Sequence, residues 1–159
     1  MNFPVVCCNY DFTNTSMEGL VKPYIVIERF GLKIGVLGVS PKLDGLVPKN
    51  KFKNIVISDP IESAANVAVY LKTVEKCDLI VCLSHLGWNT QKINDQILIA
   101  STKYIDIVLG GHTHTYLESS SSLVNAEGAH VTYSQMGKMH VLSALSVYVW
   151  NILVNNQYG

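Results

Sequence analysis

The sequence predicts an α/β protein with a mixed sheet, and three observations support this prediction. From residue 34 to residue 109, apolar runs alternate with helical patterns in the order strand, helix, strand, helix, strand, which is typical of parallel α/β units. The first strand of this region is joined by a glycine turn to the strand before it, which adds an antiparallel pair. The chain is 48% hydrophobic and 15% charged, against a usual charged share of about 25%, so it must bury a core.

The first forty residues predict a strand, a loop and a β-hairpin. Residues 5–8 form a short β-branched run that stops at the polar residues 9–11, and a loop leads from there to Pro23. Residues 24–30 and 33–39 predict the two strands of a hairpin that turns at Gly31. The second of these strands is apolar almost without interruption, so we expect it to be covered on both faces.

Two helices and two buried strands are expected next. Asp59 suits the N-cap of the first helix and Pro60 its first position. Apolar residues then recur at helical spacing, at Ile61, Ala64, Ala65, Ala68, Leu71 and Val74. Residues 79–83 predict a buried strand, residues 91–101 a second helix, and residues 105–109 another buried strand.

The pattern changes in the C-terminal part of the chain. Four consecutive serines, residues 119–122, predict a solvated loop. Residues 131–134 and 141–154 predict strands, with a turn at residues 137–138 between them. Because neither a repeat nor a linker interrupts the sequence, we expect residues 1–159 to form a single domain without an internal boundary.

Composition excludes several classes of protein. Twelve basic and twelve acidic residues give a formal charge of zero, and Arg29 is the only arginine, so we expect no nucleic-acid partner. The N-terminus lacks the pattern of a signal peptide, and the longest apolar stretch, residues 141–154, is too short to span a membrane. No two of the four cysteines form a C-x-x-C pair, and for Cys77 and Cys82 a buried hydrophobic role is favoured over a metal ligand or a disulfide.

Three of the five histidines stand where predicted strands end. His85 follows residues 79–84, and His112 and His114 follow the strand of residues 105–109. Ligands of open α/β sheets bind at that edge, and imidazole binds borderline divalent metals. On extended backbone an H-x-H pair would point both rings to one side and turn Thr113 away. The alternative is that these histidines only hydrogen-bond neighbouring loops, and for His130 and His140 such an ordinary role is favoured.

The combination of residues 83–87, Leu-Ser-His-Leu-Gly, with residues 110–115, Gly-Gly-His-Thr-His-Thr, is more specific. Together they resemble the second half of the calcineurin-like metallophosphoesterase domain, and within it the 5′-nucleotidase family. Residues 9–11, the hairpin of residues 24–39 and residues 133–138 are similar to stretches of that family in the same order. The resemblance implies one half of a layered αββα sandwich, which makes the chain a partial metallophosphoesterase domain.

The resemblance also implies a two-metal phosphoesterase, with Zn, Mn or Co as candidate ions. His85 and His112 would bind one ion and His114 the other. The D-x-H, G-D and G-N-H-E/D motifs that complete the family's site have no match here, so we expect at most one ion and no activity of the chain alone. The parent protein is expected to hydrolyse nucleoside 5′-phosphates in the periplasm or at the cell surface, and this chain to form a homo-oligomer. The alternative function is a non-catalytic folded remnant that acts through association or weak metal binding.

Overall fold

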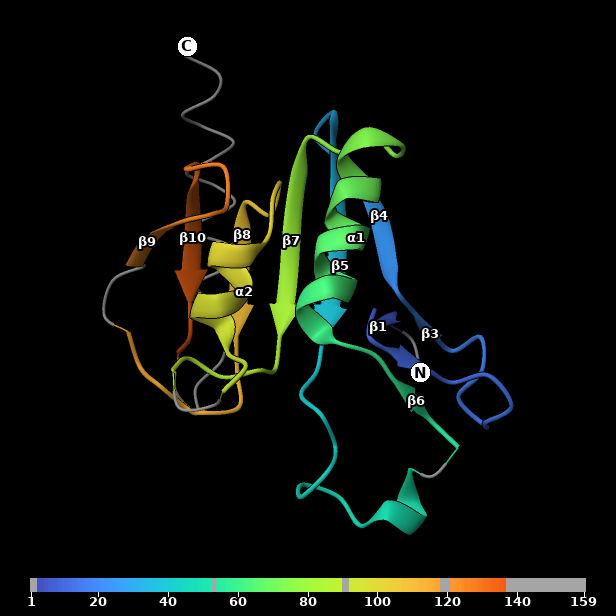
Figure 1. Ribbon diagram of the computed structural model, residues 1–159. Coiled ribbons are helices and arrows are strands. Elements are labelled where there is room, and N and C mark those ends of the chain that lie inside the picture. The colour runs from blue at the N-terminus through green and yellow to red at the C-terminus, as the bar shows by residue number, and fades with distance from the viewer. Residues whose placement is uncertain (1–2, 53, 90–91, 118–120, 137–159) are drawn as a thin grey trace.

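The computed structural model describes residues 3–52, 54–89, 92–117 and 121–136, and its centre is a six-stranded sheet (Figure 1). The strand order is β4-β5-β7-β8-β10-β9. The four central strands run parallel, whereas β4 and β9 are antiparallel to their neighbours at the two edges. The strands are β4 (Tyr24–Arg29), β5 (Leu32–Val39), β7 (Leu79–Ser84), β8 (Ile107–Gly110), β10 (His130–Ser134) and β9 (Ser121–Val124). The predicted α/β class and mixed sheet are confirmed.

Helix α1 (Pro60–Thr73) begins where the sequence predicts it. The Asp59 carboxylate accepts hydrogen bonds from the backbone N–H groups of Ile61 and Glu62, and Pro60 occupies the first turn. These contacts satisfy N–H groups that the start of any helix leaves without a partner. The apolar stripe of the helix lies on the sheet and buries Ala64, Ala68 and Leu71.

Helix α2 (Asp95–Ser101) is shorter than the predicted helix over residues 91–101. Asn94 has an extended backbone, and its side chain accepts a hydrogen bond from the N–H of Ile97, so it caps the helix. A capping asparagine competes with helical backbone before it, which fixes the start at Asp95. Residues 90 and 91, the second of which belongs to the predicted helix, lie outside the described residues.

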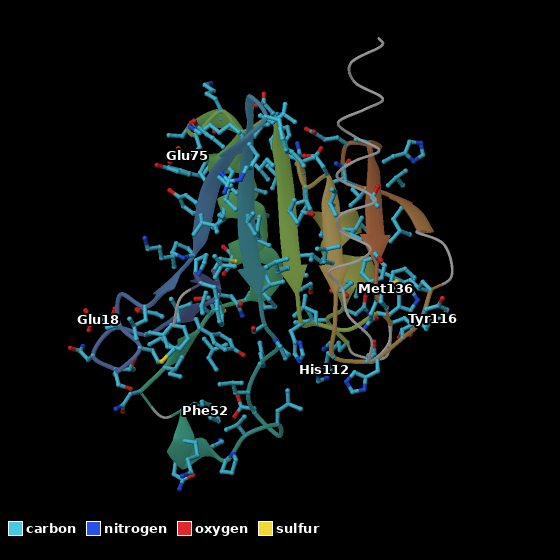
Figure 2. The ribbon with its side chains drawn as sticks, turned by 180° about the vertical axis from the view of Figure 1, so that it is seen from behind. Glu18, Phe52, Glu75, His112, Tyr116 and Met136 are labelled. Atoms are coloured by element: carbon cyan, nitrogen blue, oxygen red, sulfur yellow. The ribbon has the colours of Figure 1, made fainter. Side chains whose placement is uncertain are left out.

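The two helices cover the same face of the sheet (Figure 1). The main core lies between them and the sheet and includes Leu37, Ile80, Cys82, Val108 and Tyr133. On the opposite face Leu79, Val81 and Ile107 form a smaller cluster, and no helix of the described residues lies on this side (Figure 2). The strand of residues 34–39 is therefore covered by helices on one face only among the described residues, and the expectation that both of its faces are covered was wrong. Its apolar residues on the other face pack against the smaller cluster instead, as Ile34 and Val36 do.

Several expectations differ from the structure in detail. The serine run is not entirely a loop, because Ser121 and Ser122 begin β9, which pairs with β10. An edge strand needs only backbone hydrogen bonds, which serine supplies as well as any residue. Two short pairs were not predicted as pairs, namely β1 (Val5–Val6) with β3 (Val21–Lys22) and β2 (Tyr10–Asp11) with β6 (Val56–Ile57). The predicted strand over residues 141–154, the turn at 137–138 and His140 lie outside the described residues.

Cys77 and Cys82 have the role that the sequence predicts. All four cysteines are free thiols, and Cys77 and Cys82 are buried in the main core, which confirms their hydrophobic role. Burial raises the pKa of the Cys82 thiol well above its usual value, so this side chain stays neutral. Within the described part of the chain, no helix combines the length and the apolar character that a membrane span requires.

Candidate functional site

The fold brings two of the three candidate histidines together at one edge of the sheet. His85 follows β7 and His112 follows β8, and the last residues of these parallel strands are paired, Ser84 with Gly110. The centroids of the two imidazole rings are 5.1 Å apart, and the ring planes meet at 70°. Figure 2 shows His112 at this edge and Glu75 at the opposite one. Adjacent parallel strands thus place side chains that are distant in sequence side by side.

The charge state of His85 suits a ligand for a cation. Partial removal of its ring from water lowers the pKa of His85, and the nearby charges of His112 and His114 lower it further. His85 is therefore neutral at pH 7. Neutral imidazole is the form that binds metal ions, because the binding nitrogen must keep its lone pair free of a proton.

The segment from residue 111 to residue 114 is a turn, so the expectation of an extended H-x-H pair was wrong. His112 and His114 have φ angles of 70° and 54°, in the left-handed region that side chains other than glycine rarely adopt. The N–H of Thr113 donates to the carbonyl of Gly111 at 2.9 Å, which closes a three-residue turn around His112. A γ-turn with positive φ is rare and strained, and such strain is concentrated at functional sites.

Thr113 is not turned away from the site, in contrast to the sequence expectation. Its hydroxyl accepts a hydrogen bond from the N–H of Trp88 at 3.2 Å and donates one to Gln135 Oε1 at 3.1 Å. The turn changes the direction of the side chain, because alternation across a strand applies only to extended backbone. Thr113 thereby connects the loop after β8 to the loop after β7.

The described residues fit a metal ion only in part. Among them, no group of three or more His, Cys, Asp or Glu side chains lies close enough to hold an ion. His85 and His112 are close to each other, and His114 is near enough to affect the pKa of His85. Two imidazoles suit a borderline divalent ion but leave half of a tetrahedral shell unfilled.

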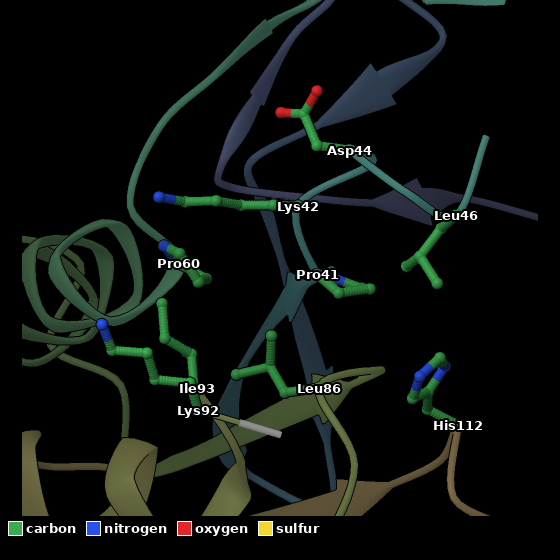
Figure 3. A pocket seen from close by; sticks show the side chains of 9 residues that line it. All are labelled: Pro41, Lys42, Asp44, Leu46, Pro60, Leu86, Lys92, Ile93 and His112. Atoms are coloured by element: carbon green, nitrogen blue, oxygen red, sulfur yellow. The ribbon is translucent and has the colours of Figure 1, made fainter. Parts of the chain in front are cut away.

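A cavity of about 370 Å³ lies beside His112 (Figure 3). Its walls come from the start of α1 and from loops that are far apart in sequence, at Pro41, Lys42, Asp44, Leu46, Pro60, Leu86, Lys92, Ile93 and His112. Within the described residues, neither Lys42 nor Lys92 has an ion-pair partner. Asp44 shares this cavity with His112, whereas Asp11 lies in β2 and accepts a hydrogen bond from the N–H of Thr13. Sequence reasoning missed both lysines, because only the tertiary structure brings them to one cavity.

Buried polar side chains connect the strand ends beneath the histidines, and sequence reasoning missed them as well. Asp95, at the start of α2, accepts hydrogen bonds from the Ser84 hydroxyl and, at 2.8 Å, from the Tyr133 hydroxyl. The same Tyr133 hydroxyl lies 3.1 Å from Gln135 Oε1, which shares its proton with Asp95, and Gln135 Nε2 donates to the carbonyl of Gly111. Asp95, Tyr133 and Gln135 are at most 1% exposed. Asp95 lay inside the predicted helix of residues 91–101, and it stands in a first turn only because α2 begins at Asp95.

Asp95 should make the stability of the chain depend on pH. Burial raises the pKa of Asp95 from 3.8 to about 6, and the hydrogen bonds from Ser84 and Tyr133 offset only part of this rise. The folded chain therefore holds this proton at pH values where the unfolded chain has released it, and stability falls as pH rises through about 6. Relative to Asp95→Asn, the free energy of unfolding should be about 2 kcal/mol higher at pH 4.5 than at pH 7.5.

Urea denaturation of both proteins at several pH values measures this difference. The variant carries the same histidines, so their titration cancels in the comparison. Parallel pH profiles for the wild-type chain and Asp95→Asn would contradict the prediction.

Comparison with known proteins identifies the relatives of the chain. No protein-family model matches it. A trifunctional nucleotide phosphoesterase of Bacillus subtilis, YfkN, is 30% identical over 142 residues, which cover 79% of this chain and 9% of that protein. An apyrase of Tabanus yao is 29% identical over 160 residues, which cover 94% of this chain and 28% of that protein. The chain thus spans less than a third of the length of either relative.

The fold of the chain is also similar to that of a solved structure. The crystal structure of a 5′-nucleotidase precursor from Thermus thermophilus matches 85% of this chain with a TM-score of 0.74 and 28% identity. The match covers 28% of that protein. The similarity therefore extends over most of the described residues.

Proposed function

This chain belongs to the 5′-nucleotidase family of calcineurin-like metallophosphoesterases, and from this family we propose its function. The full-length parent hydrolyses phosphate monoesters, and nucleoside 5′-phosphates are its substrates. The chain is one domain that supplies part of a dinuclear metal site and is inactive alone. The observation that carries this proposal is the convergence of His85 and His112 at the ends of two adjacent parallel strands.

The chain contributes metal ligands in this proposal. His85 and His112 would hold one ion, and His114 would contact the other. When bound, the ions would supply activation of a water molecule and neutralisation of charge on the phosphoryl oxygens. The neutral state of His85 leaves a ring nitrogen free to coordinate, and the turn around His112 directs that ring toward His85.

The cavity beside His112 supports an anionic substrate. Lys42 and Lys92 both line it, and their side chains lie on the side of the cavity formed by Pro60 (Figure 3). Two ammonium groups without ion-pair partners among the described residues attract an anion such as a phosphate ester. The apolar residues Leu86 and Ile93 in the same wall suit the less polar part of a nucleotide.

A specific observation also favours a second candidate, a non-catalytic domain that acts through association. No group of three potential ligands exists within the part of the chain that the structure describes. A domain with two adjacent imidazoles would bind metal weakly or not at all. Metal titration separates this candidate from the first.

The isolated chain is expected to bind at most one divalent ion. Three imidazoles without a bridging carboxylate lack the anionic ligand that holds two cations about 3.5–4 Å apart. Calorimetry with Zn or Mn measures the stoichiometry, and two tight sites per chain would contradict the expectation. His112→Ala should abolish binding. His130→Ala is the control, because His130 lies at the amino end of β10, away from the edge with His85.

The chain is also expected to form a homo-oligomer. Both edges of the sheet, β4 and β9, are open among the described residues, and Leu83 on the face without helices is 40% exposed. Open edges and exposed apolar side chains favour association. Light scattering at a fixed concentration of the purified chain should show a dimer or larger species; a monomer would contradict the expectation.

The family also suggests where the parent acts. A periplasmic or cell-surface location fits relatives named as a 5′-nucleotidase precursor and as 5′-nucleotidases. Fractionation of cells that express the full-length protein tests this location.

A further inference from the structure

We propose that Gln135 is a positioning residue, which together with Tyr133 and Asp95 holds the imidazole of His112 next to that of His85. This inference rests on the proposed function, since it concerns the two histidines assigned to the metal ion. The proposal adds a second group of side chains to the site. None of them would touch the ion, but together they would determine how the two imidazole rings lie relative to each other.

Gln135 contacts the histidine turn on both sides of His112. Its Nε2 donates to the carbonyl of Gly111, the residue before His112, and its Oε1 accepts from the hydroxyl of Thr113, the residue after it. The Gly111 carbonyl also accepts from the N–H of Thr113, so Gln135 binds the same atom that closes the turn. A single side chain that is 1% exposed thus fixes both ends of a strained turn.

Tyr133 and Asp95 connect Gln135 to the strand that carries His85. The Tyr133 hydroxyl lies 2.8 Å from Asp95 Oδ2 and 3.1 Å from Gln135 Oε1, and these two acceptors share its single proton. Asp95 Oδ1 accepts from the hydroxyl of Ser84, the residue before His85. The N–H of Asp95 donates to the carbonyl of Gly87, two residues after His85. Hydrogen bonds therefore run without a gap from the loop of His85 to the loop of His112.

The packing leaves these side chains little freedom. An added Cβ at Gly110 would overlap the Tyr133 hydroxyl and lie 2.7 Å from Asp95 Oδ2. The ring of Tyr133 also packs against Trp88, with centroids 4.4 Å apart. Because the turn around His112 has an unfavourable φ, it needs outside contacts to persist. Gln135 supplies two of them.

The test uses the ion-free 159-residue chain and three variants. Gln135→Met keeps the size of the side chain and removes its hydrogen bonds, and Tyr133→Phe removes one hydroxyl. The matched control is Thr102→Val, which removes a buried hydroxyl that donates to the Leu98 carbonyl at 2.8 Å, at the far end of α2. NMR records the nuclear Overhauser effect between the ring protons of His85 and His112, and calorimetry records Zn affinity.

We expect the ring-to-ring effect to disappear in Gln135→Met and Tyr133→Phe and to persist in Thr102→Val. Zn affinity should fall about 10- to 100-fold in the first two variants and stay unchanged in the control. Persistence of the effect in Gln135→Met, or its equal loss in Thr102→Val, would overturn the proposal. So would its absence from the wild-type chain.

Two further outcomes separate this proposal from the proposed function. If the wild-type chain binds no Zn but the ring-to-ring effect still depends on Gln135, the positioning role holds and the metal-site assignment fails. If Gln135→Met does not fold, Thr113→Val replaces it, an isosteric change at a half-buried position that removes the hydrogen bond to Gln135 Oε1 and the acceptor of the Trp88 N–H. Because the bond from Gln135 Nε2 to the Gly111 carbonyl remains, the ring-to-ring effect should weaken in this variant, and an unchanged effect would overturn the proposal.

Discussion

The 159-residue chain by itself is expected to show no measurable hydrolysis of AMP or p-nitrophenyl phosphate with Mn, Zn or Co. Alignment of the attacking and leaving oxygens needs two ions and the carboxylates that hold them. Loss of one electrostatic contributor commonly costs about 10²- to 10³-fold in rate, and several that act as a unit cost more. A standard phosphate-release assay with each metal measures this.

The full-length parent protein is the positive control for this assay. It should hydrolyse AMP, and His85→Ala should abolish that activity. Metal-dependent turnover by the isolated chain, lost in His114→Ala, would contradict the prediction. It would require ligands beyond the three histidines, and Asp44 would be tested first, since it lines the cavity beside His112, followed by Asp11.

Gly110→Ala is expected to destabilise the folded chain by about 4 kcal/mol. The new methyl group would overlap the Tyr133 hydroxyl and lie 2.7 Å from Asp95 Oδ2, so both buried side chains would have to move. Overpacking costs about 1–3 kcal/mol, and a broken hydrogen bond to a buried polar group costs a similar amount. Urea denaturation at neutral pH measures the change in the free energy of unfolding.

Gly111→Ala is the matched control, one residue further along the chain. Its nearest contact would be Nδ1 of His85 at 3.2 Å, and that imidazole is exposed and can move. We expect a loss of about 1 kcal/mol. If the two substitutions lowered the free energy of unfolding equally, the loss in Gly110→Ala would not come from overlap with Tyr133 and Asp95, and the prediction would be wrong.

The site was only partly predictable from the sequence. The positions of some of its residues follow from local sequence patterns, whereas those of others depend on contacts with distant parts of the chain. His85 and His112 were predictable as neighbours, since both follow apolar runs with the pattern of adjacent parallel strands. Gln135 lies within residues 133–138, which resemble the family, but its contact was not predictable, because the carbonyl of Gly111 is a backbone atom that the sequence does not distinguish. The left-handed φ of His112 could not be predicted from the sequence either, since histidine does not favour that conformation.

By itself the sequence determined the α/β class, the start of α1 and the strands that end at the histidines. These features depend on local chemistry: a capping aspartate before a proline, and apolar runs of strand or helix period. Only the tertiary structure decided that Ser121 and Ser122 join a strand, that α2 begins at Asp95, and that Lys42 lines a cavity with His112. Each of these depends on a partner distant in the chain or on a cap that competes with the helix, and local propensity does not encode the choice.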